Sequence, residues 1–126
     1  MSMTKNPLKG WQVDRSDIRT RGVDLQRPEC ILAERDGTLW TADARGVVRL
    51  NNDGSQALIR QQGVADRDLN AAAMLMGGSL PNGIAFDRGG NILIANFGTD
   101  AIELMTRDGQ SRTLHDRIDG EPLGKT

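Results

Sequence analysis

Residues 79–96 of the chain, SLPNGIAFDRGGNILIAN, repeat a pattern that already occurs at residues 26–43, QRPECILAERDGTLWTAD. A shift of 53 positions, the separation of Pro28 from Pro81, superimposes the two stretches. A repeat near this length is typical of stacked or radial arrays of one supersecondary unit. The repeated unit is therefore the basis on which the fold is predicted.

Each copy predicts a short apolar strand, a tight turn and a second apolar strand. Asp36-Gly37 and Gly89-Gly90 stand at the turns, where glycine supplies the positive φ that a two-residue hairpin turn requires. A third and a fourth candidate strand follow in each copy, at residues 46–50 and 56–60, and again at residues 101–105 and 111–115. Four short antiparallel strands per repeat make a propeller blade.

The predicted fold class is therefore all-β, with about two to two and a half four-stranded blades of a β-propeller. The expected parts are an N-terminal arm with a closing strand (1–27), a first blade (28–64), a helix-like connection (65–80), a second blade (81–115) and the start of the next connection (116–126). We expect one or two edge strands within residues 11–25 and no strand after residue 116. The short helix expected at residues 71–76 is interpreted as an inter-blade connection, or else as a partner-binding lid.

The number of blades is too small for a closed ring. Propellers use about four to eight blades of roughly 40–45 residues, and the chain has 126 residues. Open strand edges invite pairing with other chains. We expect a piece of a longer propeller, in preference to a unit that completes itself by oligomerising, and in either case missing blades or self-association would be needed for a complete fold.

Composition argues against several classes of partner. The net charge is −1 and only four residues are aromatic, so neither nucleic acid nor an anionic membrane is expected as a partner. The single cysteine excludes an internal disulfide framework and suits a reducing compartment. Because no apolar run is long enough for a signal peptide or a membrane span, we expect a cytoplasmic protein.

Glu29 and Asn82 are the candidate site residues. Each follows a proline at the start of the first strand of its repeat, and in a propeller the first strands line the central channel. A carboxylate and an amide carbonyl are hard oxygen donors that suit a divalent cation. The alternative is plain turn chemistry, since Asn82-Gly83 is a favourable turn dipeptide.

Other polar residues carry weaker signals. Cys30 is expected to be a small buried thiol and His115 an ordinary strand-end residue, because neither has a catalytic partner nearby in sequence. Asp43 and Asn96, equivalent in the repeat, are expected to cap turns. The glycine spacing of residues 120–126 is too short for a phosphate-binding loop, and that interpretation is rejected.

The repeat resembles a known family. The segments PNGIAFD (81–87) and NILIAN (91–96), together with Pro28-Glu29 and DGTLW (36–40), are similar to the senescence-marker-protein/gluconolactonase/LRE family of regucalcin-like proteins. The resemblance implies the N-terminal portion of a six-bladed propeller, with one divalent metal ion (Ca²⁺, Zn²⁺ or Mg²⁺) in its channel. It also implies a metal-binding role for Glu29 and a metal-binding or substrate-binding role for Asn82.

The resemblance further implies a metal-dependent lactonase-like hydrolase that opens a sugar lactone or a similar cyclic ester. The chain departs from the family at Cys30, where glycine is more usual, and the family's general-base aspartate lies in a later blade than the two present here. No catalytic residue is therefore assigned, and the chain is expected to be incomplete and inactive alone. The alternative is a non-catalytic propeller module that binds a protein or a ligand.

Overall fold

The computed structural model describes residues 5–66, 69–70, 72 and 77–125. Strands dominate the described chain, and its one complete helical element is the 3₁₀ turn η1 (Arg15–Asp17). The strands are β1 (Ile31–Ala33), β2 (Leu39–Asp43), β3 (Gly46–Leu50), β4 (Gln56–Arg60), β5 (Pro81–Phe86), β6 (Ile92–Asn96), β7 (Ala101–Met105), β8 (Ser111–His115), β9 (Arg117–Ile118) and β10 (Glu121–Pro122).

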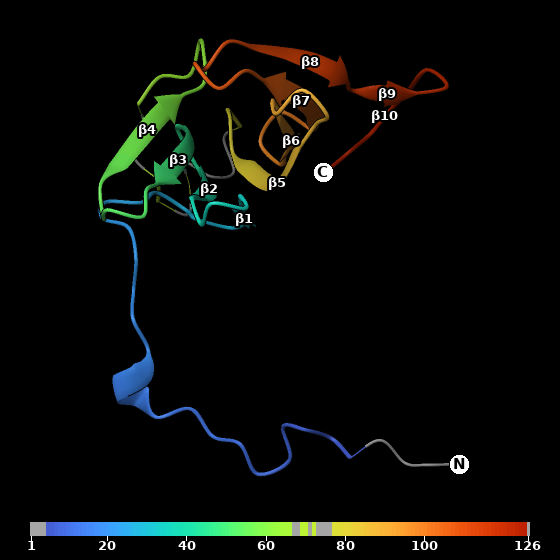
Figure 1. Ribbon diagram of the computed structural model, residues 1–126. Coiled ribbons are helices and arrows are strands. Elements are labelled where there is room, and N and C mark those ends of the chain that lie inside the picture. The colour runs from blue at the N-terminus through green and yellow to red at the C-terminus, as the bar shows by residue number, and fades with distance from the viewer. Residues whose placement is uncertain (1–4, 67–68, 71, 73–76, 126) are drawn as a thin grey trace.

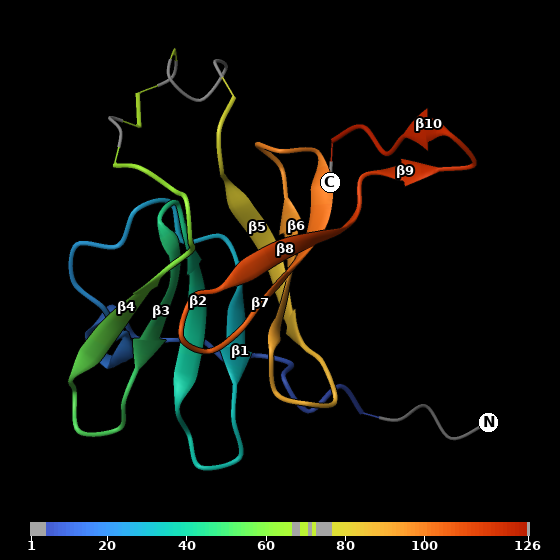
Figure 2. The ribbon, with the colours of Figure 1, turned by 90° about the horizontal axis from the view of Figure 1, so that it is seen from above.

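These strands form three antiparallel sheets. The first sheet has the order β1-β2-β3-β4, the second has the order β5-β6-β7-β8, and β9 pairs with β10 in the third. The two four-stranded sheets lie side by side (Figures 1 and 2). The prediction of an all-β chain with two four-stranded units is confirmed. Each unit is blade-like, and the two together do not close a ring.

The register confirms the sequence repeat. Ile31 pairs with Thr41 in the first sheet, and Ile84 pairs with Ile94 in the second. Both members of the second pair follow those of the first by the same 53 positions that relate the two sequence copies. The two sheets are therefore equivalent residue by residue along their first two strands.

The hairpins turn at the predicted glycines, but the predicted two-residue loops are wrong. The amide of Glu34 donates to the carbonyl of Thr38, and the amide of Gly37 donates to the carbonyl of Glu34, which encloses a three-residue loop. A three-residue loop ends in a left-handed residue, a conformation that glycine adopts without strain. The β3–β4, β5–β6 and β7–β8 loops close in the same way, with positive φ at Gly54, Gly90 and Gly109.

The core lies between the two four-stranded sheets. Trp40, Ala42 and Val47 of the first sheet pack with a group from the second sheet that comprises Ile84, Ile92, Ile94 and Met105. The Trp40 and Phe86 rings meet edge to face, with centroids 6.0 Å apart. Burial of these apolar side chains is the main force that holds the sheets together.

An ion pair crosses the same interface at its rim. A guanidinium nitrogen of Arg107, from the second sheet, lies 2.7 Å from Glu34 of the first. The guanidinium also lies 5.1 Å from the centroids of both the Trp40 and the Phe86 rings. Glu34 in addition accepts the indole N–H of Trp40 at 2.8 Å. These bonds from Arg107 and Trp40 lower the pKa of the Glu34 carboxyl.

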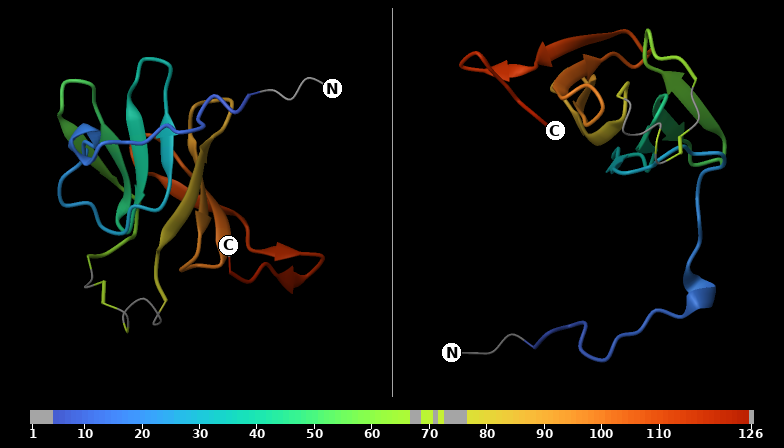
Figure 3. Two further views of the ribbon diagram at one scale, coloured as in Figure 1. Left: turned by 90° about the horizontal axis from the view of Figure 1, so that it is seen from below. Right: turned by 180° about the vertical axis from the view of Figure 1, so that it is seen from behind.

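The N-terminal arm differs from the expectation. The predicted edge strands within residues 11–25 are not formed, and the described residues 5–19 extend away from the sheets (Figures 1 and 3). Residues 20–26 do lie against the first sheet, where the backbone of Val23 exchanges two hydrogen bonds with the Gln56 side chain. A strand requires a partner strand for its backbone groups, and in the described part of the chain none pairs with residues 11–19.

The C-terminal tail also differs, because a strand pair forms where none was predicted. β9 and β10 make a short hairpin that projects beyond β8 (Figure 1). Its turn is Asp119-Gly120, and both residues have positive φ, as a type I′ turn requires. The helix predicted at residues 71–76 lies outside the described residues, apart from Ala72.

Candidate functional site

The candidate residues Glu29 and Asn82 lie at the starts of β1 and β5. Glu29 directly precedes Cys30 and β1, and its side chain is 45% exposed. Asn82 is half-buried and lies in β5 where the pairing with β6 shifts register, between Pro81 and Gly83. β5 packs against both β1 and β2, so the two strand starts belong to adjoining parts of the molecule.

Arg27 connects these two strand starts. One terminal nitrogen of its guanidinium lies 3.4 Å from a carboxylate oxygen of Glu29, and the other donates at 3.4 Å to the carbonyl of Pro81, next to Asn82. The guanidinium also lies 5.8 Å from the Phe97 ring centroid. Its Nε is buried and has no hydrogen-bond partner among the described residues. A single cation therefore contacts Glu29 and the residue that precedes Asn82.

The predicted caps hold the chain just before each strand start. Asp43 accepts the amide of Gln26 at 2.8 Å, and Asn96 accepts the amide of Leu80 at 2.8 Å. Both caps are fully buried. The same residues also accept the amides of Arg45 and Gly98 at 3.0 and 3.1 Å, which confirms the prediction that they cap the turns after β2 and β6. They therefore both cap turns and anchor the segments that carry Glu29 and Asn82.

The two anchored segments differ in length. Three residues, 27–29, separate Gln26 from Cys30, whereas only Pro81 and Asn82 separate Leu80 from Gly83. The longer segment includes Arg27 in a left-handed backbone conformation, with φ of 54°. An alignment with a constant shift hides this extra residue, which explains why sequence analysis did not single out Arg27.

Hydrogen bonds favour the charged form of the buried Asp43 carboxylate. Burial alone raises the pKa of Asp43, but two side-chain hydrogen bonds from Arg45 and the amides of Gln26 and Arg45 outweigh it. The net effect is a pKa below the ordinary value for aspartate. Arg45 in turn donates to the carbonyl of Asp24, so the cap also fixes the segment that leads into the site.

The oxygen donors at the strand starts fit a divalent cation only in part. Glu29 and Asn82 have the right donor chemistry, but Ca²⁺ takes six to eight oxygen ligands. Within residues 5–66, 69–70, 72 and 77–125, no three His, Cys, Asp or Glu side chains lie together in a group that could hold a metal ion. Arg27 is moreover a competing cation at Glu29. These residues fit a metal ion as part of a ligand set and not as a complete one.

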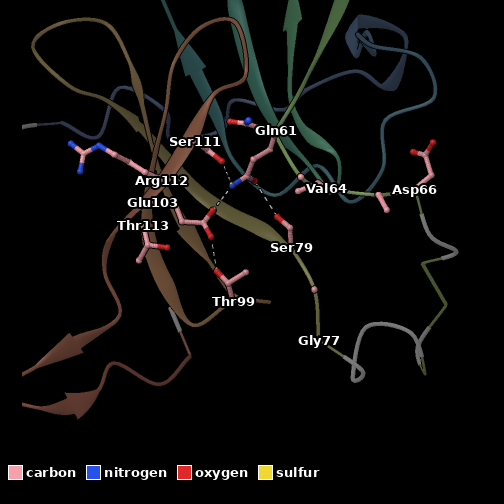
Figure 4. Close-up of a pocket in the computed structure, with 14 residues that line it drawn as sticks. Gln61, Val64, Asp66, Gly77, Ser79, Thr99, Glu103, Ser111, Arg112 and Thr113 are labelled. Carbon is pink, nitrogen blue, oxygen red and sulfur yellow. Dashed lines mark hydrogen bonds between the residues drawn. The ribbon is translucent and has the colours of Figure 1, made fainter.

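A second candidate site is a polar pocket of about 670 Å³, lined by β7 and β8 of the second sheet and by the segments that follow β4 and precede β5 (Figure 4). Glu103 of β7 lies in its wall and is only 6% exposed. The Glu103 carboxylate accepts hydrogen bonds from Gln61 at 2.6 Å, Asn96 at 2.9 Å and Thr99 at 2.8 Å. Gln61 directly follows β4 of the first sheet, and its side-chain oxygen accepts a hydrogen bond from the hydroxyl of Ser79 at 3.1 Å. The pocket volume lies in the range of small-molecule sites.

Sequence analysis did not identify this pocket. Glu103 pairs with Ile94 in the second sheet, and the equivalent pair in the first sheet is Val48 with Thr41. Val48 is buried and apolar. The signal in the sequence was the carboxylate of Glu103 at a position where the first copy has the apolar Val48. Strand alternation alone does not reveal that difference.

The remaining candidates have ordinary surroundings. Cys30 is half-buried beside the core, and its thiol donates to the carbonyl of Ile84 at 3.7 Å, as expected for a small packed thiol. His115 is exposed at the end of β8. Among the described residues, no helix has the length and apolar character needed to span a membrane.

The comparisons with known proteins add no family assignment. No protein-family model matches the chain, and none of the curated proteins compared with it matches. The function proposed below therefore depends on the residues themselves and on the motifs that suggest the lactonase-like family.

Proposed function

We propose that the chain supplies part of the site of a metal-dependent lactonase-like hydrolase, with Glu29 as a metal ligand and Asn82 as a metal or substrate ligand. The observation that supports this most is the shared contact of Arg27 with Glu29 and with the carbonyl before Asn82, at 3.4 Å each. Two strand starts that one guanidinium reaches are close enough for one small ligand to reach as well.

Each residue has a definite part in this proposal. Glu29 supplies the negative charge that holds a metal cation. Its side chain is exposed enough for a metal cation to replace Arg27 as its partner. The Asn82 amide supplies a neutral oxygen donor or orients an ester carbonyl through its N–H groups. A divalent cation, when bound, supplies Lewis-acid polarisation of that carbonyl. Arg27, once released from Glu29, is placed to attract an anionic substrate group.

Calorimetric titration of the full chain with Ca²⁺, and separately with Zn²⁺, tests this assignment. We expect weak binding, with a dissociation constant on the order of 10⁻⁴–10⁻³ M, because few ligands are available. Glu29→Gln is expected to weaken binding at least tenfold, since it removes the only formal charge of the pair. Arg27→Gln is expected to strengthen metal binding, because the substitution removes the guanidinium that competes with the metal ion for Glu29.

The matched control is Glu121→Gln, an exposed carboxylate on β10, which is expected to leave the metal affinity unchanged. Lactone hydrolysis, followed by acid release, is expected to stay at the rate of buffer alone for the isolated chain, because no general base is assigned. Metal binding that is the same in wild type and Glu29→Gln would show that the assignment of Glu29 is wrong.

The polar pocket supports a second candidate, a non-catalytic binding module. The pocket has hydrogen-bonding groups from β7 and β8 of the second sheet and from the segment that follows β4, and its volume suits a small polar ligand. The titration above separates the two candidates, since a binding module has no need of Glu29 as a metal ligand. If Glu29→Gln has no effect, the binding module becomes the better proposal.

A further inference from the structure

Glu103 is a buried acidic residue in the wall of the polar pocket. It is 6% exposed, and it accepts side-chain hydrogen bonds from Gln61, Asn96 and Thr99. The side-chain oxygen of Asn96 accepts backbone amides, among them that of Leu80, so its NH₂ group is the part that faces Glu103. These neighbours therefore all donate to Glu103, which is how a carboxylate bonds.

Within the part of the chain that the structure describes, no cationic side chain pairs with Glu103. Each ion pair among those residues involves a different carboxylate. Arg112 also lines the pocket, but Figure 4 shows its side chain directed away from Glu103, whose carboxylate points toward Gln61. A buried charge is costly unless an opposite charge compensates it. A cation that enters the pocket would supply that compensation.

The first sheet shows how its own buried carboxylate is balanced. Asp43 ends β2, and Arg45, in the two-residue loop that follows, donates to it at 2.8 and 3.0 Å. In the second sheet the loop after β6 comprises residues 97–100, FGTD, which include no cationic residue. Thr99 of this loop instead donates to Glu103. The second sheet therefore has a buried carboxylate beside the equivalent loop but not the arginine that balances it in the first.

The repeat indicates that the fold does not require a carboxylate at this position. Glu103 pairs with Ile94, and in the first sheet the equivalent partner of Thr41 is Val48, which is buried and apolar. Replacement of buried ionic groups by apolar groups of similar size is often neutral or stabilising. A carboxylate where the repeat accommodates valine is better explained by binding than by folding.

We propose that the pocket binds a small organic cation with N–H donors, an ammonium or a guanidinium, and that Glu103 is its charge partner. The proposal rests on the role of the pocket as a binding site, the second candidate above. The other carboxylate in the wall, Asp66, is exposed and paired with Arg60. One buried carboxylate supplies too few ligands for a hard metal ion, but it suffices for a charge-assisted hydrogen bond. The hydroxyls of Ser111 and Thr113 in the same wall can accept the remaining N–H groups.

Titration of the full ¹⁵N-labelled chain with methylguanidinium chloride, followed by amide chemical shifts, tests the proposal. We expect saturable shifts at residues 99, 103 and 111–113, with a dissociation constant on the order of 10⁻³ M, because so small a ligand gains little binding energy. Methylurea has nearly the same shape without the charge, and we expect it to bind at least about tenfold more weakly. Tetramethylammonium has the charge without N–H groups and is also expected to bind more weakly.

Substitution of Glu103 tests its role directly. Glu103→Gln keeps the side-chain length and removes the charge, so it is expected to weaken methylguanidinium binding at least about tenfold and to leave methylurea binding nearly unchanged. The matched control is Asp66→Asn in the same wall, which is expected to change the affinity less than about twofold, because Asp66 is exposed and already paired. If circular dichroism shows that Glu103→Gln is unfolded, the comparison of methylguanidinium with methylurea on wild type decides.

Three results would overturn the proposal: no saturable binding of methylguanidinium at these amides, equal affinity for methylguanidinium and methylurea, or unchanged affinity in folded Glu103→Gln. Methylurea that binds at the pocket amides as tightly as methylguanidinium would retain the binding module and reject only the preference for a cation. The proposed metal site is judged separately, by the Ca²⁺ titration of Glu29→Gln, because neither Glu29 nor Asn82 lines the pocket.

Discussion

Replacement of Asp43 by asparagine tests the physical account of the anchor that precedes β1. Asn96 already occupies the equivalent position in the second sheet and accepts the equivalent amide, that of Leu80. Asp43 differs in having a charge partner, because its carboxylate accepts two side-chain hydrogen bonds from Arg45 at 2.8 and 3.0 Å. Asp43→Asn keeps one oxygen acceptor and directs an NH₂ group at donors from Arg45 or Gln26.

The expected loss follows from those contacts. A hydrogen bond to a charged group contributes about 1.5–3 kcal/mol, and removal of one partner of a buried ion pair costs more than the pair contributes. Asp43 is fully buried, and the Arg45 side chain is largely so. We therefore expect Asp43→Asn to lower the free energy of unfolding by about 2–4 kcal/mol at neutral pH.

The same substitution is expected to change the pH dependence. The pKa of Asp43 is lowered in the folded state, so its contribution to stability is complete above the unfolded pKa of about 3.9. This contribution is lost as the pH falls through the lower, folded pKa. The difference in stability between wild type and Asp43→Asn should therefore be constant near pH 7 and should shrink only below about pH 4.

Urea denaturation at pH 7 and pH 3, followed by tryptophan fluorescence, measures both effects. All samples are compared at one low protein concentration, because association would add to apparent stability. Asp53→Asn is the control: hydrogen bonds from Ser55 also lower the pKa of Asp53, but this carboxylate is exposed in a hairpin loop, and its midpoint should change little. A difference between wild type and Asp43→Asn that is equally large at both pH values would refute the reasoning.

Two further substitutions test packing, the first between the sheets and the second at the entry to β5. Trp40→Ala removes the largest core side chain and leaves Glu34 without the indole donor, so we expect a loss of about 3–5 kcal/mol in urea denaturation; a loss below about 1 kcal/mol would contradict the assigned core. Gly98→Ala would place a methyl group 1.7 Å from the carbonyl oxygen of Gly78, so the variant is expected to lose its cooperative unfolding transition. Gly83→Ala is the matched control, because its added methyl group would lie 3.8 Å from the nearest atom, and equal stability of the two alanine variants would contradict this account.

Local patterns were sufficient to predict the two sheets. Short apolar runs identified the strands, and the glycines at positions 37 and 90 marked the hairpins, because both signals act over a few residues. The caps Asp43 and Asn96 were predicted for the same reason. The loop length was predicted wrongly, because a glycine suits the left-handed position of both two-residue and three-residue loops.

The errors have a common physical origin in tertiary contacts. Residues 11–25 have the composition of edge strands, but a strand forms only where a partner satisfies its backbone, and that partner lies outside local sequence. The tail was expected to be turn-like and without a strand. Asp119-Gly120 is nevertheless a hairpin dipeptide, and two residues on either side of it pair. Arg27 and Glu103 were missed because their roles depend on what the other sheet brings beside them.

The Arg27–Glu29 pair sets the condition for metal binding at the proposed site. One chain brings two oxygen donors, Glu29 and Asn82, to the starts of its first strands, which is too few for a hard cation. Arg27 lies 3.4 Å from Glu29, so a cation would have to displace the guanidinium before it gains the carboxylate. Metal affinity would therefore depend on the strength of this partly exposed ion pair as well as on the number of oxygen donors.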